Sequence, residues 1–227
     1  MKYPSIALWG DSIGRGIDYD PERGRYAVMK TNFAKMLIER GVTAMSNHAR
    51  FGATITMGID DFEATQDLPE DHVMLEFGGN DCNMPWAEVS AQPERLHDAA
   101  TPLALFEETL RRFVERIRAR GKTPLLLTPP PLVADRFAAW VSQGLDKEAV
   151  YRYLGDVQHV YRWHERYANA VRRVAIDLQC QLLDLRDRLL GERAYPSLVG
   201  IDGMHINAAG HSAIAGHLEE LLAEAFA

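Results

Sequence analysis

Residues 5–14 of the 227-residue chain read SIALWGDSIG, an apolar run followed at once by a glycine-flanked serine. A run of this length is typical of a buried strand, and Gly, Asp and Ser are typical of the turn after a strand. Four similar runs follow along the chain, at Val42–Ser46, His72–Phe77, Thr123–Thr128 and Cys180–Leu183. We therefore expect five buried strands, the first of them at Ser5–Trp9.

Longer segments with helical periodicity separate these runs. They lie near Ala27–Arg40, Ile55–Thr65, Ala104–Arg120, Gln158–Leu178 and Ala208–Phe226, and Asn207 is well placed as the N-cap of the last one. Strands that alternate with helices are typical of βαβ units, in which the strands run parallel. The pattern predicts an α/β fold, a three-layer α/β/α sandwich around a five-stranded parallel sheet. Because no linker or repeat interrupts it, we expect a single domain over residues 1–227.

Two connections are much longer than the usual loops of an α/β fold. One spans residues 81–103, and the other spans residues 129–156 with a short helix expected around Phe137–Val141. Both leave the carboxyl ends of strands, where open α/β sheets bind ligands. These connections are therefore expected to border a functional site.

Composition and charge exclude several classes of protein. Apolar residues make up 47% of the chain, which indicates a soluble protein with a sizeable core, and the formal charge of −7 disfavours a nucleic-acid-binding surface. No segment reaches the roughly 20 apolar residues of a membrane span. Two cysteines, Cys82 and Cys180, make neither a disulfide framework nor a four-ligand zinc site. Residues 1–9 lack the features of an export signal, so a cytoplasmic location is expected.

The first strand ends in Gly10-Asp11-Ser12-Ile13-Gly14, which matches the G-x-S-x-G pattern of a nucleophile elbow. A serine becomes a nucleophile when a neighbouring base removes its proton, and small flanking residues permit the sharp turn that exposes it. The elbow of the α/β-hydrolase fold follows earlier strands, whereas only nine residues precede Gly10. Taken alone, the pentapeptide fits a plain turn as well as a nucleophile.

Three further polar clusters follow predicted strands. Asp202-Gly203-Met204-His205 lies just before the last helix, and an Asp three residues before a His can accept the imidazole N–H and orient the ring. Gly78-Gly79-Asn80-Asp81 pairs glycines, which let the backbone approach a ligand, with an amide that suits an oxyanion. In the segment after the second strand, Asn47 precedes Gly52, which can present its backbone N–H freely.

Together these four blocks resemble the SGNH (GDSL-like) hydrolase family, whose blocks are centred on Ser, Gly, Asn and His in that order. Ser12 stands in GDS, Gly52 after Asn47, Asn80 in GGND and His205 in DGMH, so the resemblance spans residues 10–205. It implies a flavodoxin-like sandwich and hydrolysis of esters or thioesters without a metal or other cofactor. The one departure, Ile13 in place of the leucine of the family name, is expected to affect packing only.

The resemblance also implies roles for individual residues. Ser12 would be the nucleophile and His205 its base, with Asp202 as the partner that orients the base. The oxyanion hole would comprise the Ser12 N–H, the Gly52 N–H and the Asn80 side chain. The expected partner is a small-molecule ester, and the oligomeric state stays open.

Other residues near these blocks are open to two interpretations. Trp86 and Trp140, in the long connections, could line a substrate pocket or simply cover the sheet, and we favour the pocket. Cys82 is expected to be a small packed residue, and His211 is expected at the surface. Asp11 and Asp81 are expected to hold loops through backbone N–H groups.

The function predicted is a short-chain acyl or acetyl esterase. A thioesterase or lysophospholipase would use the same site, and a non-catalytic ligand-binding protein would use the same scaffold. A nucleotide-binding protein is disfavoured because no phosphate-binding glycine loop follows the first strand. A long apolar tunnel would favour lipid acyl chains, and a shallow polar cleft would favour acetylated sugars.

Overall fold

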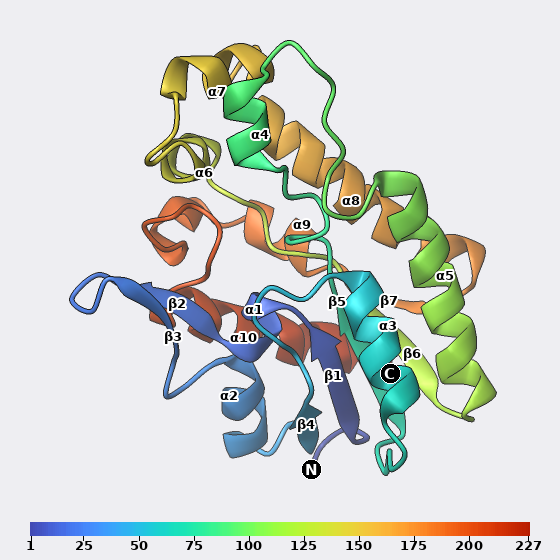
Figure 1. Cartoon of the computed structure of the whole chain (residues 1–227). Coiled ribbons are helices and arrows are strands. Elements are labelled where there is room, and N and C mark those ends of the chain that lie inside the picture. Colours follow the sequence, from blue (N-terminus) through green and yellow to red (C-terminus); the bar gives the residue numbers. More distant parts are fainter.

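The computed structural model describes residues 1–227 and has a five-stranded parallel sheet at its centre. The strands are β1 (Ile6–Gly10), β4 (Met45–Asn47), β5 (His72–Glu76), β6 (Thr123–Leu127) and β7 (Gln181–Leu183). They lie in the order β4-β1-β5-β6-β7, the order of flavodoxin-like sheets. Each strand falls on or beside a run predicted from the sequence, so the α/β class and the five-stranded parallel sheet are confirmed (Figure 1).

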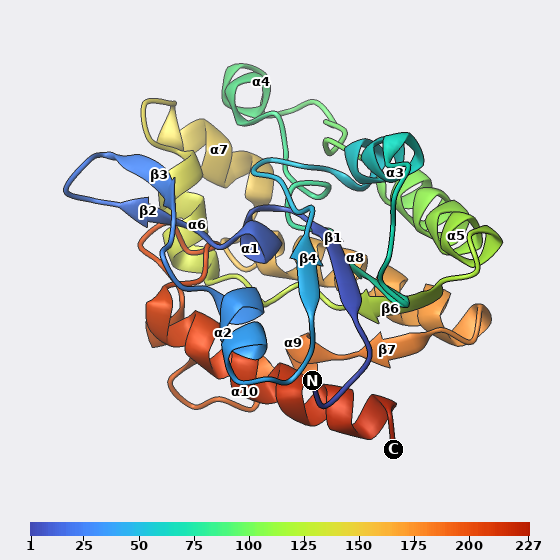
Figure 2. The same ribbon diagram turned by 90° about the horizontal axis from the view of Figure 1, so that it is seen from below.

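Helices cover both faces of this sheet (Figure 2). One face is covered by α3 (Ile55–Ala64), α5 (Leu103–Ala119) and α8 (His159–Asp177). The other is covered by α2 (Phe33–Glu39), α9 (Leu185–Leu190) and α10 (Ala208–Ala225). The three-layer α/β/α arrangement predicted from the sequence is therefore observed.

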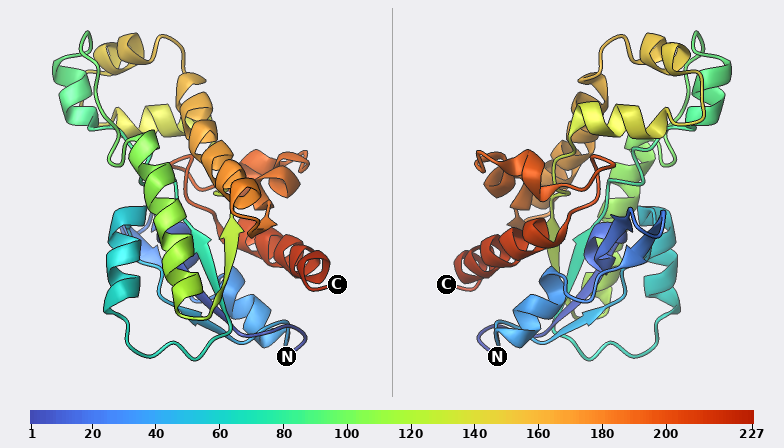
Figure 3. Two further views of the ribbon diagram at one scale, coloured as in Figure 1. Left: turned by 90° about the vertical axis from the view of Figure 1, so that its right-hand side faces the viewer. Right: turned by 90° about the vertical axis from the view of Figure 1, so that its left-hand side faces the viewer.

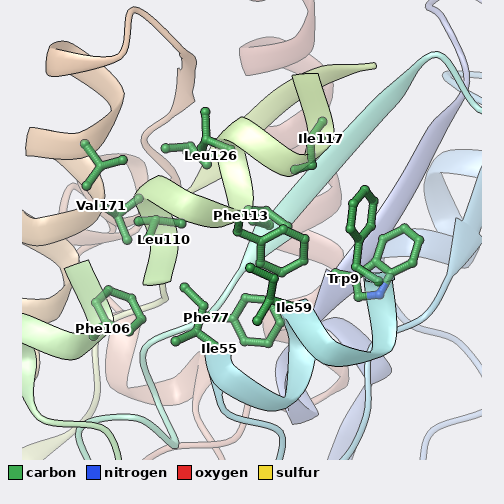
Figure 4. Packing of buried hydrophobic residues seen from close by; sticks show 14 of the residues in the cluster. Trp9, Ile55, Ile59, Phe77, Phe106, Leu110, Phe113, Ile117, Leu126 and Val171 are labelled. Atoms are coloured by element: carbon green, nitrogen blue, oxygen red, sulfur yellow. The ribbon is translucent and has the colours of Figure 1, made fainter. Parts of the chain in front are cut away.

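Side chains of the central strands alternate between two buried clusters because the side-chain period of a strand is two. Ala7 and Trp9 of β1 join the cluster under α3, α5 and α8, whereas Ile6 and Leu8 join the cluster under α2, α9 and α10. Figure 4 shows the first cluster, where the apolar face of α5 packs toward α3 and β1. The α5 residues recur at helical spacing and are Phe106, Leu110, Phe113 and Ile117.

The two long connections contain more helix than the sequence predicted. The connection 81–103 contains α4 (Trp86–Ala91), and the connection 129–156 contains α6 (Ala134–Val141) and α7 (Lys147–Leu154). Only the last part of α6 was expected. These helices pack on a third, smaller apolar cluster that includes Leu132, Phe137 and Val150, and they lie above the carboxyl ends of the strands (Figure 3).

The helix predicted near Ala27–Arg40 is wrong over its first part. Residues Ile17–Asp20 (β2) and Arg25–Val28 (β3) form an antiparallel hairpin outside the main sheet, and α2 begins only at Phe33. Asn32 decides the helix start, since its side chain accepts a hydrogen bond from the Lys35 N–H at 3.1 Å. An aromatic and a β-branched residue, Tyr26 and Val28, favour the strand before it.

One histidine lies where the sequence did not place it. His211 of α10 is completely buried, not at the surface, and its ring stacks on Phe33 of α2 with centroids 5.7 Å apart. Burial, together with the charge of nearby His205, lowers the pKa of His211 to about 4. The sequence of α10 alone does not reveal that His211 is buried. The residue that covers it, Phe33, belongs to α2 near the other end of the chain. None of the helices combines the length and apolar character that crossing a bilayer requires.

Candidate active site

The serine turn lies where β1 ends and the short helix α1 (Ser12–Arg15) begins. Asp11 caps α1, because its Oδ1 accepts a hydrogen bond from the Ile13 N–H at 2.9 Å. Ser12 is the first residue of α1, so its N–H has no partner within the helix. Its side chain is 4% exposed, at the carboxyl edge of the sheet.

A buried glutamate at the end of β5 supports this turn. Glu76 is 1% exposed, and its Oε2 accepts hydrogen bonds from the Asp11 N–H at 3.4 Å and the Gly14 N–H at 3.1 Å. A Cβ at Gly10 would lie 2.9 Å from the same oxygen and 2.8 Å from the Glu76 carbonyl. The first glycine of the serine turn is therefore required by the close approach of Glu76.

Burial raises the pKa of Glu76 well above its usual range, and the neighbouring Asp11 carboxylate raises it further. Loss of hydration and a like charge nearby both disfavour the ionised form of a carboxyl group. Both effects favour the neutral form of the Glu76 carboxyl group beneath the turn.

The histidine lies in a tight loop before α10. Its His205 Nε2 is 2.9 Å from Ser12 Oγ, and its Nδ1 is 2.6 Å from Asp202 Oδ2. Gly203 makes the turn between Asp202 and His205 with φ of +77°, and a Cβ there would lie 2.4 Å from the Phe137 N. The loop therefore packs directly against α6, which fixes its position.

Asp202 is 1% exposed and is surrounded by hydrogen-bond donors. Burial alone would raise its pKa, but the hydrogen bond and charge of His205, with the Met204 and His205 N–H groups, lower the pKa of Asp202 to about 2. A fourth donor is the Tyr26 hydroxyl, 2.9 Å from Asp202 Oδ2. Asp202 is therefore ionised at neutral pH.

The three groups expected to form an oxyanion hole are available as donors. Gly52 has φ of +75°, and neither its N–H nor that of Ser12 donates to another protein atom. Asn80 Nδ2 donates one hydrogen to Asp11 Oδ2 at 3.2 Å, which leaves its second hydrogen free. Asp81 links the two loops, since its Oδ1 accepts a hydrogen bond from the Ile55 N–H at 2.9 Å.

The two aspartates therefore hold loops through backbone N–H groups, as expected. Asp11 does so at the serine turn, and Asp81 does so at the start of α3.

The two tryptophans lie in different places. Trp140 is in contact with the β2–β3 hairpin, with its ring 4.7 Å from that of Tyr19 and 6.4 Å from that of Tyr26, which itself covers His205. Trp86 lies instead beside Phe137, where it lines a small apolar cavity behind the Asn80 loop. The volume of this cavity is about 20 Å³, enough for about one water molecule.

The side chain of Cys82 also borders this cavity and is buried. Its Sγ–H donates to the Gly79 carbonyl at 3.2 Å, and burial raises the pKa of the thiol. A thiol in this environment stays protonated and packs as a small apolar group. No group of three His, Cys, Asp or Glu side chains in the structure is placed to hold a metal ion.

The model of the GDSL-like lipase/acylhydrolase family matches residues 8–213, most of the chain. The chain belongs to this family. The resemblance found in the sequence is therefore confirmed, and with it the class of enzyme, a GDSL-type hydrolase.

Solved structures similar to this GDSL-family chain share its whole fold. A lipase/acylhydrolase from Enterococcus faecalis is 18% identical with a TM-score of 0.63, over 98% of this chain and 97% of the other. An acetylxylan esterase from Geobacillus stearothermophilus is also 18% identical, with a TM-score of 0.65 over 98% of this chain and 96% of the other. An α/β hydrolase enzyme from the metagenome of Lake Arreo, Spain, is 21% identical, with a TM-score of 0.66 over 97% and 95%. No curated protein matches the sequence at a significant level.

Sequence reasoning missed two residues that contact the candidate site of this GDSL-family chain. Glu76 had a visible signal, because an acidic residue at the end of an otherwise apolar central strand needs a buried partner. The sequence carried no signal for Tyr26. It lies 176 positions before its partner Asp202, on a hairpin whose residues were partly predicted to be helical.

Proposed function

We propose that the chain hydrolyses a carboxylic ester, or a thioester, with Ser12 as nucleophile, His205 as base and Asp202 as the residue that orients the base. The observation that carries this proposal is the hydrogen-bonded series from Ser12 Oγ to His205 Nε2 at 2.9 Å and from His205 Nδ1 to Asp202 Oδ2 at 2.6 Å. Both distances are within the reach that proton transfer and ring orientation need.

In the first step, Ser12 Oγ attacks the carbonyl carbon while His205 Nε2 takes the hydroxyl proton. The tetrahedral intermediate collapses as His205 donates that proton to the leaving alcohol or thiol, which leaves an acyl-enzyme on Ser12. Water then attacks the acyl group, and His205 again takes a proton. The second tetrahedral intermediate collapses as His205 returns this proton to Ser12 Oγ, so that the carboxylic acid departs and the serine is restored.

The negative charge that develops on the carbonyl oxygen needs donors that are already in place. The free N–H groups of Ser12 and Gly52 and the second amide hydrogen of Asn80 fit this need. Because Asp11 already holds the Asn80 amide, little reorganisation is required when the charge forms. We therefore assign these three donors to the oxyanion hole.

A short acyl or acetyl group is the substrate class that we favour. The acetylxylan esterase with the same fold acts on an ester of this size. We extend the proposal to Trp86, which lines the cavity, and to Trp140, which flanks Tyr26, as substrate-contacting residues.

A panel of substrates distinguishes this class from the alternatives. It comprises p-nitrophenyl esters of increasing chain length, acetylated xylose, acyl-CoA and lysophospholipid. The proposal predicts the highest kcat/KM with acetyl esters. A preference for acyl-CoA or lysophospholipid would instead indicate a thioesterase or a lysophospholipase.

Ser12→Ala tests the nucleophile directly. Loss of the hydroxyl should reduce ester hydrolysis by at least about 10⁴-fold without lowering the melting temperature, and should abolish labelling by a fluorophosphonate probe. Ser212→Ala, at an exposed serine of α10, is the control and should behave as the wild type. A folded wild-type protein that neither reacts with the probe nor hydrolyses any ester would support the non-catalytic alternative.

A further inference from the structure

The β2–β3 hairpin carries a tyrosine into contact with the Asp202–His205 pair. Tyr26 lies on β3, directly opposite Tyr19 of β2. Its hydroxyl is 2.9 Å from Asp202 Oδ2, the same oxygen that lies 2.6 Å from His205 Nδ1. The hairpin lies outside the main sheet, so this contact is not a by-product of packing in the central core (Figure 1).

The direction of this hydrogen bond follows from the charges. Asp202 has a pKa of about 2 and can only accept, so the phenol must donate. Burial of Tyr26 raises the pKa of its phenol, and the negative charge of Asp202 raises it further. The phenol therefore keeps its proton at neutral pH. A hydrogen bond to an ionised acceptor is stronger than one between neutral groups.

Tyr26 completes the set of donors around the carboxylate. Asp202 Oδ1 accepts from the Met204 N–H at 2.9 Å and the His205 N–H at 3.0 Å, and both of these donors belong to the same loop as Asp202. Tyr26 is the donor from a different element, and it therefore fixes the carboxylate relative to the rest of the molecule. Its ring also covers the imidazole, with centroids 4.7 Å apart.

We infer that Tyr26 is a positioning residue for the catalytic histidine, acting through Asp202: its hydroxyl fixes Oδ2 and takes up part of the carboxylate charge that faces His205. This inference rests on the proposed roles of Ser12, His205 and Asp202. It assigns a function to the β2–β3 hairpin, which otherwise adds nothing to the sheet.

Tyr26→Phe removes the hydroxyl and keeps the ring. Without the phenol, Asp202 is less well oriented, so kcat for p-nitrophenyl acetate should fall about 10-fold while KM changes by less than about twofold. More of the carboxylate charge then faces the imidazole and favours its protonated form. The acidic limb of the kcat/KM profile should therefore move to higher pH, by about half a unit.

Other titratable groups around the pair stay unchanged in this variant. They are Asp18 on β2, Asp11 in the serine turn and His211 on α10. A shift of the limb is therefore assigned to the lost phenol.

The matched control is Tyr19→Phe, which removes a hydroxyl from the opposite position of the same hairpin. Its kcat and pH profile should equal those of the wild type. Two further measurements are the rate of Ser12 labelling by a fluorophosphonate and the downfield proton resonance of the His205–Asp202 hydrogen bond. Both should change in Tyr26→Phe alone, and a thermal melt confirms that each variant is folded.

A Tyr26→Phe enzyme with kcat within twofold of wild type would overturn the inference. A fall in kcat that leaves the acidic limb and the downfield resonance in place, or that Tyr19→Phe shares, would overturn it as well. Failure of the proposed function is distinguishable. It would appear as full activity in Ser12→Ala, or as a wild-type protein with neither esterase activity nor probe labelling, whatever Tyr26→Phe does.

Discussion

Asn80 donates one hydrogen of its amide within the protein, and we propose that the other is directed toward a substrate carbonyl. One hydrogen is held by Asp11 Oδ2 at 3.2 Å, and Asp11 in turn caps α1 through the Ile13 N–H. The orientation of the amide is therefore coupled to the turn that carries Ser12. An asparagine can donate to Asp11 and to a substrate oxygen at the same time, because its amide nitrogen carries two hydrogens.

Asn80→Ala should lower kcat by about 100- to 1000-fold, the typical loss for one oxyanion donor. KM should change little, because the ground-state carbonyl needs this hydrogen bond far less than the tetrahedral intermediate does. The measurement is kcat and KM for the variant, with a thermal melt to confirm folding.

Asn80→Asp is the companion variant and should be at least as inactive, because a carboxylate repels both the oxyanion and Asp11. A folded Asn80→Ala enzyme with kcat within threefold of wild type would remove Asn80 from the oxyanion hole.

At the scale of the element, helix α10 begins three residues after His205 and anchors the loop that holds it. Asn207 is its N-cap, as the sequence predicted: Oδ1 accepts from the Gly210 N–H at 3.0 Å, and Nδ2 donates to the Ser197 carbonyl at 2.8 Å. The cap thus joins α10 to the 3₁₀ helix Tyr195–Leu198 that precedes the loop.

Asn207→Ala should lower the free energy of unfolding by about 1–2 kcal/mol, because the helix loses its cap and the Ser197 carbonyl loses a donor. Asn207→Asp is the matched variant, which keeps the cap and loses only the donor, so its loss should be smaller. Urea denaturation at pH 7 measures both. Equal losses in the two variants would show that the cap contributes nothing.

The hairpin illustrates how an element can be misread. Residues 27–32 continue the apolar pattern of α2 toward the amino terminus, and this pattern led to the prediction of a longer helix. The structure shows that Asn32 ends that pattern with a cap and that Tyr26 pairs with Tyr19 instead. Local periodicity does not distinguish these outcomes, because the pairing partner is supplied by another segment.

At the scale of the whole molecule, buried titratable groups make stability depend on pH. His211 lies between α10 and α2 and has a pKa of about 4, below its ordinary value of 6.5. Between these two values the unfolded chain binds a proton that the folded chain does not. The free energy of unfolding therefore has its full value, as far as His211 is concerned, above pH 6.5. It decreases as the pH falls toward 4.

The difference between the folded and ordinary pKa values of His211 gives a prediction for stability. Protonation of this residue alone should lower the free energy of unfolding by about 2 kcal/mol when the pH falls from 7.5 to 5. His211→Gln, which cannot be protonated, should lose that part of the pH dependence, although its stability at pH 7.5 is also expected to be lower. Urea denaturation of both proteins at the two pH values gives the comparison. A variant with the same slope as the wild type would show that other groups cause the acid sensitivity.

Much of the fold and of the candidate site could be predicted because the signals are local. Apolar runs with their following turns located all five strands of the sheet. The Ser, Gly and Asn blocks come after strands, and the His block precedes the last helix. In a parallel sheet the carboxyl ends of the strands lie at one edge, so blocks far apart in sequence were expected to converge there. The observed distances between Ser12, His205 and Asp202 agree with that expectation.

The sequence by itself determined the class of the fold, the five strands of its main sheet and the family, because these depend on periodicity and short motifs. Only the tertiary structure decided which side chains support the candidate site. Glu76 approaches Gly10 and Gly14 from a neighbouring strand, and Tyr26 reaches Asp202 from a hairpin 176 residues earlier. The physical reason is that such contacts depend on the register of strands and the docking of loops, which are set by packing across the molecule and leave no periodic trace in the residues on either side.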